Sequence, residues 1–262
     1  MNILDKIVLD KRKEVDLRKS LIPHSQLEDS VLFHKSTFSL ANALRTSPTG
    51  IIAEHKRRSP SKSVINQSLS VQDVAMGYED AGACGMSVLT DGKYFGGSLD
   101  DLLLARAAVG LPLLRKEFII DEYQILEAKA HGADLILLIA AILSTEEIKT
   151  FSELAQSIHL EVLLEVHNEK ELHKSMMPSL DLVGVNNRNL KTFELSLATS
   201  KELSRSIPDD FVKVSESGIG SVAAIRELKE YGYQGFLIGE NFMKTQDPGA
   251  GAKAFIDTLN DR

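Results

Sequence analysis

Residues 135–166 read LILLIAAILSTEEIKTFSELAQSIHLEVLLEV, and this stretch contains the repeating unit that decides the fold. It begins with an apolar run at 135–143, continues through an amphipathic segment at 146–158 and reaches a second apolar run at 162–166. A short apolar run is typical of a parallel strand that is buried on both faces. The stretch therefore predicts a strand, a crossover helix and the next parallel strand.

Similar apolar runs recur along the chain from residue 51 onward. They predict strands at 51–54, 85–89, 112–116, 135–139, 162–166, 182–186, 211–215 and 235–238. Amphipathic segments between them predict helices at 71–81, 122–130, 146–158, 197–203 and 222–231. Eight strands that alternate with helices close into a barrel more readily than they form an open sheet. The predicted fold class is α/β, a single (β/α)8 TIM barrel with its catalytic barrel at 48–262.

The first 47 residues lie outside this alternation and predict an N-terminal helical extension of the same domain. Hydrophobic residues repeat there at helical spacing, and a second helix is expected at 39–44. Such an extension can pack against the wall or bottom of the barrel, or it can cap the catalytic mouth. The sequence favours neither placement.

Composition narrows the class of protein. A chain of 262 residues with a formal net charge of -7 lacks the positive surface that nucleic acids and anionic membranes attract. Its longest apolar run, at 135–143, is shorter than the roughly 18 residues that suggest a membrane span. The single cysteine, Cys84, cannot form an intramolecular disulfide, and no Cys/His cluster has metal-ligand spacing. We expect a cytoplasmic protein with no metal, no nucleic-acid partner and no membrane partner.

Polar side chains gather at the ends of five predicted strands. Residues two apart on a strand point to the same side, and the catalytic groups of barrels lie where the strands end. Any one polar residue here is explained by an ion pair or a solvated strand end. Five together favour a functional site, because buried charges are costly unless they are paired. These positions are Glu54 and Lys56 on the first strand, Lys116 on the third, Glu165 on the fifth, Asn186 and Arg188 on the sixth, and Glu216 on the seventh.

Glycine-containing turns follow the last two strands. Ser217 and Gly218 begin the turn after the seventh strand, and Gly239 and Glu240 follow the eighth. These loops commonly bind phosphate in this fold, because glycine lets backbone N–H groups approach an anion. Ordinary turn glycines explain either turn alone, whereas both together favour a phosphate site.

Other residues near strand ends carry less information. A basic Ser/Pro-rich loop at 56–62 is suited to a bound anion, although it is more typical of a solvated loop. Asp91 and the turn at 95–97 are candidates for shaping the mouth. His55 and His167 are expected on loops near strand ends, where a hydrogen-bonding role is favoured over catalysis.

Seven segments resemble the indole-3-glycerol-phosphate synthase family, and they run in order through nearly the whole barrel. Small departures from the family pattern, such as His55 where an aromatic residue is common and Ser63 where glycine is common, fall on loops and leave the proposed catalytic groups in place. The segments are AEHKRRSPS at 53–61, VLTDGKYFGGSLDDL at 88–102, LRKEFIIDEYQI at 114–125, LLEVH at 163–167, GVNNRNL at 184–190, SESGI at 215–219 and FLIGENFM at 236–243.

The resemblance implies a carbon-carbon lyase of tryptophan biosynthesis that uses no cofactor. Its substrate would be an anionic small molecule, 1-(2-carboxyphenylamino)-1-deoxy-D-ribulose 5-phosphate, which undergoes ring closure, decarboxylation and dehydration. An unperturbed lysine has a pKa of about 10.4, so Lys116 suits the role of general acid. Glu54 and Glu165 are candidates for the base or stabilising group. Lys56 could hold the carboxylate, contact the phosphate or act as the acid in dehydration.

The remaining site residues are assigned by the same resemblance. Asn186 and Ser217 complete the catalytic set with Lys116, Glu165, Glu54 and Lys56; Arg188, Glu216, Phe95 and Phe118 would bind the substrate; and Ser59, Lys56, Gly218, Gly239 and Glu240 would surround its phosphate.

Three other readings of the sequence remain. An inward lysine such as Lys116 also suits a lyase or aldolase that forms a Schiff base with a sugar phosphate. Phosphoribosylanthranilate isomerase is a second barrel alternative. The paired lysines and glutamates, together with the N-terminal extension, argue against it. A barrel without activity could serve as a binding or assembly module. The sequence leaves open the oligomeric state, regulation and any association with other tryptophan-pathway enzymes.

Overall fold

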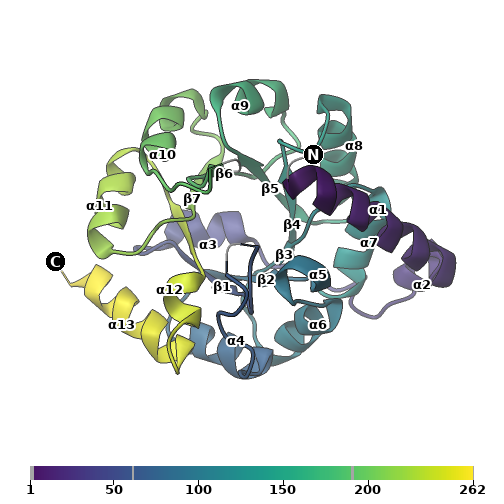
Figure 1. Ribbon diagram of the computed structural model, residues 1–262, viewed down its shortest axis with the longest axis horizontal. Helices are drawn as coiled ribbons and strands as arrows, with labels where there is room; N and C mark the ends of the chain where they lie inside the picture. The colour runs from purple at the N-terminus through teal and green to yellow at the C-terminus, as the bar shows by residue number, and fades with distance from the viewer. Residues whose placement is uncertain (1–2, 61, 190–191, 262) are drawn as a thin grey trace.

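The computed structural model describes residues 3–60, 62–189 and 192–261, and in them eight parallel strands form a closed barrel (Figure 1). Each strand pairs with its neighbours in sequence, and β8 pairs with β1. The predicted TIM barrel is confirmed, with strand limits that differ from the predicted ones by at most one residue. The strands are β1 Ile51–His55, β2 Gly85–Leu89, β3 Leu113–Lys116, β4 Leu135–Ile139, β5 Glu161–Val166, β6 Leu182–Asn186, β7 Val212–Glu216 and β8 Gly235–Ile238.

Helices surround the barrel, and five of them lie where the sequence predicts them. These are α4 Val71–Asp80, α7 Glu122–Ala130, α8 Thr145–Ser157, α10 Ala198–Leu203, which continues into a short 3-10 turn at Ser204–Ser206, and α11 Val222–Glu230. The prediction did not include α5 Gly92–Phe95, α6 Leu99–Ala108, α9 Glu169–Ser175, α12 Glu240–Met243 and α13 Pro248–Asn260.

Apolar side chains fill the barrel below its mouth. They come from alternate residues of the strands, so each strand contributes the face that points inward. On β1, β3, β5, β6 and β7 the inward positions at the strand ends carry charged or polar groups, as the sequence predicts. The apolar interior consists of Ile52, Leu114, Leu135, Leu137, Ile139, Leu163, Leu182, Val212, Val214 and Leu237, together with residues of the extension.

The N-terminal extension contacts both ends of the barrel. Helix α3, Leu40–Thr46, begins at Ser39, whose side chain accepts a hydrogen bond from the Asn42 backbone N–H. Its buried Leu40 and Leu44 pack into the apolar interior from below. Helix α1, Ile3–Leu21, passes beside α7 on the side of the barrel (Figure 1), and its first turn lines the cavity at the mouth. The two placements left open by the sequence therefore both occur, one for each helix. Between them lies the short helix α2, His24–Glu28.

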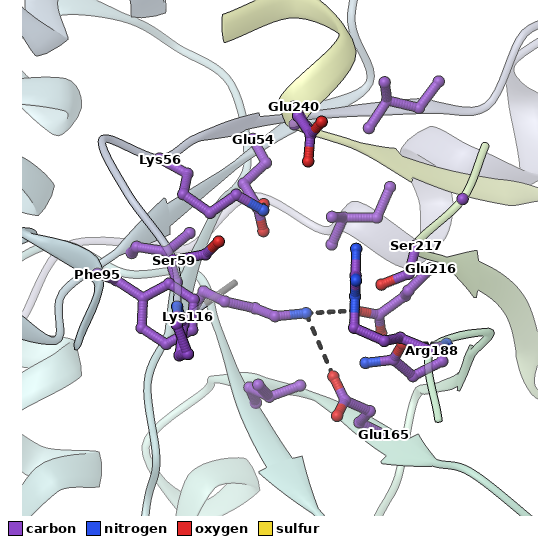
Figure 2. Close-up of a pocket in the computed structure, with 18 of the residues that line it drawn as sticks. Glu54, Lys56, Ser59, Phe95, Lys116, Glu165, Arg188, Glu216, Ser217 and Glu240 are labelled. Atoms are coloured by element: carbon purple, nitrogen blue, oxygen red, sulfur yellow. Dashed lines mark hydrogen bonds and ion pairs between the residues drawn. The ribbon is translucent and has the colours of Figure 1, made fainter. Parts of the chain in front are cut away.

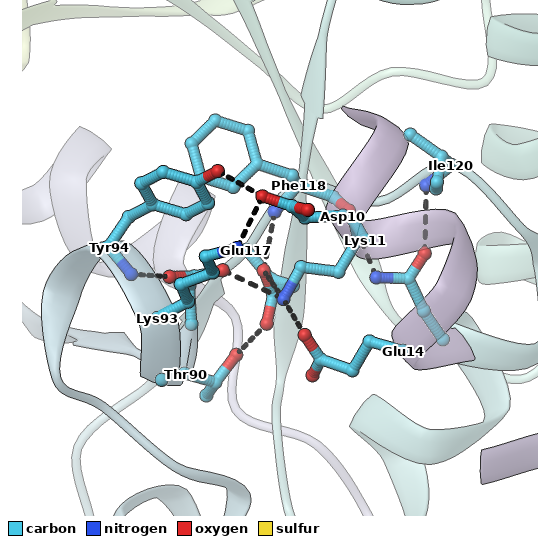
Figure 3. Close-up of polar contacts among 12 residues, drawn as sticks. Asp10, Lys11, Glu14, Thr90, Lys93, Tyr94, Glu117, Phe118 and Ile120 are labelled. Carbon is cyan, nitrogen blue, oxygen red and sulfur yellow. Dashed lines mark hydrogen bonds and ion pairs between the residues drawn. The ribbon is translucent and has the colours of Figure 1, made fainter. Parts of the chain in front are cut away.

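A buried lysine fastens α1 to the rim of the barrel (Figure 3). Only 2% of Lys11 is exposed, and its Nζ lies 2.8 Å from Asp91 Oδ2, 3.1 Å from Glu117 Oε1 and 2.9 Å from Glu14 Oε2. Burial alone would lower the pKa of Lys11, but these carboxylates hold it above its ordinary value. The ammonium group thus joins α1 to the segments that follow β2 and β3.

Asp91 and Glu117, the two partners of Lys11 outside α1, also order the backbone beside the mouth. Asp91 accepts a hydrogen bond from the Tyr94 backbone N–H and so begins α5. Glu117 accepts hydrogen bonds from the Phe118 backbone N–H and the Thr90 hydroxyl. The position of α1 is therefore tied to the two segments that carry the aromatic wall of the mouth.

Replacing Lys11 with methionine should destabilise the protein by about 3–5 kcal/mol, because the change leaves buried carboxylates without their cation. Chemical denaturation followed by circular dichroism measures this loss. Lys93→Met is the matched control, since the Lys93 side chain is 59% exposed in its ion pair with Asp10, and an exposed pair contributes little to stability. Equal losses in the two variants would show that the buried lysine has no special importance for stability.

Candidate active site

A cavity of about 380 Å³ opens where the carboxyl ends of the strands meet. Active sites of TIM barrels lie at this face. Every residue that the sequence proposes for the site lines this one cavity. These residues are Glu54, Lys56, Ser59, Phe95, Lys116, Phe118, Glu165, Asn186, Arg188, Glu216, Ser217, Gly218, Gly239 and Glu240.

Lys116 reaches into the middle of the cavity from the end of β3. Figure 2 shows its ammonium group directed toward two carboxylates, Glu216 on β7 and Glu165 on β5. It donates a hydrogen bond to Glu216 Oε2, and its Nζ lies 3.4 Å from Glu165 Oε2. Burial alone would lower the pKa of Lys116, yet Glu216, Glu165 and Glu54 together hold it above the ordinary lysine value. Lys116 is therefore protonated at neutral pH.

A second lysine–glutamate pair lies at the end of β1. Lys56 Nζ lies 2.7 Å from Glu54 Oε1, and the Ser87 hydroxyl is 3.4 Å from Glu54 Oε2. Burial would raise the pKa of Glu54, but Lys56 and Lys116 lower it below its ordinary value. Glu54 is therefore an ionised carboxylate that faces two cations.

Glu216 is in a different electrostatic environment from Glu54. Burial raises its pKa to about 7, and the carboxylates of Glu165 and Glu54 add to the rise, while Lys116 opposes it. Neighbouring carboxylates with separated pKa values can take different acid–base roles. The mouth therefore holds one carboxyl group that changes its charge near neutral pH and another, Glu54, that stays ionised.

Two glycines make room for these glutamates inside the barrel. A Cβ atom on Gly184 would lie 2.3 Å from Glu216 Oε1, and one on Gly239 would lie 2.5 Å from Glu54 Oε1. Both distances are far below van der Waals contact. The absence of a side chain on β6 and after β8 thus determines where the two carboxylates can lie.

The loops after β7 and β8 border one side of the cavity. Ser217 and Gly218 have φ values of 67° and 76°, so two successive residues take the left-handed conformation that a non-glycine residue such as Ser217 seldom adopts. The buried Asn187 supports this turn through hydrogen bonds from its Nδ2 to the carbonyl oxygens of Glu216 and Ser217, at 3.0 and 3.1 Å. Sequence reasoning missed Asn187, because its partners lie about thirty residues away along the chain.

The opposite wall of the cavity is apolar. Phe95 and Phe118 lie with their ring centroids 6.0 Å apart. Ile3, Leu4 and Ile7 of α1 line the same cavity. Sequence analysis noted their helical spacing but did not place them in the site, because helical periodicity does not reveal which surface a helix covers. The wall is suited to a flat apolar group.

The two histidines near strand ends differ from expectation in one respect. His55 was expected on a loop but is the last residue of β1, and burial together with the nearby Arg57 lowers its pKa to about 4. The error reflects a strand one residue longer than predicted. His167 does lie just after β5, as expected.

The described residues contain neither a metal-binding cluster nor a membrane-spanning helix. Within 3–60, 62–189 and 192–261, no group of three or more His, Cys, Asp or Glu residues is arranged to hold a metal ion. None of the helices in these ranges has the length and apolar character needed to cross a membrane. Ser61 and Leu190, which belong to two of the family-like segments, lie outside the described residues.

The closed barrel, with its paired lysines and glutamates at the carboxyl ends of the strands, defines the class of protein as a TIM-barrel enzyme. The family model for indole-3-glycerol phosphate synthase matches residues 4–255. The chain belongs to the indole-3-glycerol phosphate synthase family, whose members are decarboxylating lyases of tryptophan biosynthesis.

Individual relatives agree with this assignment. The indole-3-glycerol phosphate synthase of Bacteroides thetaiotaomicron is 45% identical over 258 residues, which cover 98% of this chain and 99% of that protein. The protein of the same name from Polaromonas sp. strain JS666 is 43% identical over 252 residues, with coverage of 95% and 96%.

Solved structures of more distant proteins share the fold. A chain of the tryptophan synthase α2β2 complex from Pyrococcus furiosus has a TM-score of 0.59 at 14% identity and covers 82% of this chain and 98% of its own. KGPDC from Streptococcus mutans has a TM-score of 0.58 at 11% identity, with coverage of 80% and 96%. At these identities the likeness concerns the barrel architecture alone.

Gly184→Ala should break the hydrogen bond between Lys116 and Glu216, because the added Cβ displaces the carboxylate. Since Lys116 is the group that lowers the pKa of Glu216, its pKa should rise further above about 7. Carbon-detected NMR titration of the glutamate carboxyl groups measures this shift. Gly110→Ala is the control, since its Cβ would meet its nearest neighbour at 3.4 Å and Gly110 precedes β3, at the end of the strand away from Lys116. A Glu216 titration unchanged by Gly184→Ala would contradict the proposed crowding.

Proposed function

We propose that the chain converts 1-(2-carboxyphenylamino)-1-deoxy-D-ribulose 5-phosphate into indole-3-glycerol phosphate by acid–base catalysis with lysines and glutamates. The observation that carries this proposal is the position of the Lys116 ammonium, which lies between Glu216 and Glu165 in the cavity. The second pair, Lys56 and Glu54, provides another acid and carboxylate in the same space. The reaction needs acids and a base at separate atoms, and these two pairs can supply them.

Ring closure is the step assigned to Lys116. The aromatic carbon that bears the carboxylate attacks the ribulose carbonyl carbon, and the carbonyl oxygen needs a proton as the new bond forms. The carboxylates around Lys116 keep it protonated, and its aliphatic stem rises from β3 into the cavity. General acid catalysis of this kind typically contributes about 10²- to 10⁴-fold.

Decarboxylation then needs no electron acceptor outside the substrate. Ring closure interrupts the aromatic system and creates an iminium. When the bond to the carboxylate breaks, its electron pair restores the aromatic ring and neutralises the iminium, and carbon dioxide leaves. The apolar wall of Phe95, Phe118 and α1 is suited to the benzene ring that takes part in this step.

Dehydration requires a base and an acid at different atoms of the intermediate. The base removes a proton from the new five-membered ring, and the acid protonates the departing hydroxyl. Glu54 on β1 and Glu165 on β5 are the candidates for the base. The charge of Lys116 on β3 interacts with both carboxylates. Lys56, paired with Glu54, is the candidate for the second acid.

The remaining residues would orient the substrate. The phosphate would lie against the turns at Gly218 and Gly239, near Ser59 and the backbone of Glu240, because these groups border one region of the cavity. The ribulose hydroxyl groups would then lie between this region and Lys116. Their proposed contacts are Asn186, Arg188, Glu216 and Ser217, which line the intervening surface.

Lys116→Met should reduce kcat by about 10²- to 10⁴-fold while changing KM much less, because the lost proton transfer belongs to the transition state. The chain contains no tryptophan, so the fluorescence of the indole product can be followed without a protein indole signal. Circular dichroism establishes that the variant is folded. Lys56→Met provides the comparison, since a phosphate or carboxylate contact would raise KM, whereas a role as the second acid would lower kcat.

The same assay separates the rival functions. Full turnover by Lys116→Met would keep the reaction but overturn the assignment of the general acid. A substrate adduct at Lys116 after borohydride reduction, found by mass spectrometry, would instead support Schiff-base chemistry. Substrate binding without any turnover by the unaltered chain would support a barrel that serves as a binding module.

A further inference from the structure

His167 is the first residue after β5, and its imidazole lies close to the carboxylate of Glu165. Its side chain is 9% exposed, and its Nε2 is 3.4 Å from Glu165 Oε1. Lys116 Nζ is the same distance from the other carboxylate oxygen, Oε2. Glu165 therefore has a nitrogen group near each of its two oxygens, one from β3 and one from the loop that follows its own strand.

Glu171 holds His167 from its other side. His167 Nδ1 lies 3.2 Å from Glu171 Oε2, and the His167 backbone N–H donates to the same oxygen at 2.9 Å. The second oxygen of Glu171 accepts a hydrogen bond of 2.7 Å from Asn168 Nδ2. Asn168 is also the N-cap of α9 and accepts from the Glu171 backbone N–H. The carboxylate of Glu171 is thus fixed by local contacts at the start of α9.

The charges next to the imidazole favour a protonated His167. Glu165 Oε1 lies 3.4 Å from its Nε2, and Glu171 Oε2 lies 3.2 Å from its Nδ1. Buried charges are stabilised when each has a partner of the opposite sign. Protonation of His167 would place a cation between these two carboxylates.

We propose that protonated His167, held by Glu171, is a positioning residue that fixes the carboxylate of Glu165 for catalysis. The charge of its imidazolium attracts Oε1, while Lys116 lies beside Oε2. This inference rests on the proposed function in one respect, namely that Glu165 takes part in the reaction.

The pH dependence follows from the groups around the imidazole. Burial alone would lower the pKa of His167, but the hydrogen bond to Glu171 and the charges of Glu165, Glu171 and Glu216 raise it above its ordinary value. The cation is therefore present below this raised pKa and is lost as the pH rises through it. Removing the charge of Glu171 should lower the pKa of His167, because burial then outweighs the remaining attraction.

NMR titration of the histidine rings in the full chain tests this arrangement without any need for turnover. His167→Asn identifies the resonance of His167. Glu171→Gln should lower the pKa of His167 by about one unit or more, which is a tenfold change in proton affinity, and Glu165→Gln should lower it in the same direction. An unchanged pKa in both variants would overturn the proposal.

The same helix offers a matched control. His173 Nε2 lies 3.4 Å from Glu169 Oε1, and both side chains are mostly exposed. Glu169→Gln removes a carboxylate from an i,i+4 histidine pair of the same kind, yet it should leave the titration of His167 unchanged. A shift of His167 in this variant as large as that in Glu171→Gln would overturn the assignment to Glu171.

Turnover tests the effect on Glu165. In Glu171→Gln, the fall of kcat at high pH should move to lower pH together with the pKa of His167. His167→Asn should lower kcat about tenfold with little change in KM. Its kcat profile should also lose the fall at high pH that we assign to the ionisation of His167. Unaltered kcat and pH profiles in both variants would overturn the proposal. If the unaltered chain has no turnover, the proposed function fails, while the NMR titration still decides whether His167 and Glu171 form this pair.

Discussion

The pairing of buried charges at the carboxyl ends of the strands is the constraint on which the site depends. An isolated ionised group loses several kcal/mol when it leaves water, so a buried lysine or glutamate is tolerated only beside a partner. Lys116 meets this requirement with two glutamates from strands on different sides of the barrel. The closed barrel brings these strand ends together above apolar layers that offer no charged partner. Fold and site therefore depend on each other.

The same constraint operates where α1 meets the rim. Lys11 is buried among Asp91, Glu117 and Glu14, so α1 is joined to the segments after β2 and β3 by charges that have little access to water. Glu117 directly follows Lys116, and Asp91 begins the short helix that carries Phe95. The helix that lines one wall of the cavity is thus held in part by Glu117, the neighbour of the proposed general acid Lys116.

The sequence predicted the strands because buried parallel strands are continuous apolar runs, and it predicted the polar residues at strand ends because side chains alternate along a strand. Ser59, Phe95 and Phe118 were predicted only through the family resemblance. Helices were predicted less completely. Helix α9 is short and polar. Helix α13 begins with Pro248 and contains glycines in its first turn, which suggest a loop. Its helical signals are the N-cap Asp247 and the proline, which is favoured at a first helical position. The contacts of Lys11 with Asp91 and Glu117 could not be predicted, since no local pattern encodes contacts between residues so far apart in sequence.

The pairing of His167 with Glu171 could be predicted only in part. A local sequence pattern marks the start of α9, but it does not show that the same residues act on a carboxylate in the cavity. Asn168 and Glu171 have the spacing of an N-cap and the third residue of a helix, which a reader of the sequence can recognise. What the sequence does not show is that β5 places Glu165 within reach of the same imidazole. Lys116, Glu165, His167 and Glu171 then form a row of alternating charges from the cavity to the start of α9. In a barrel, each catalytic strand end continues into the loop before a helix, so a helix cap can influence a charge inside the mouth.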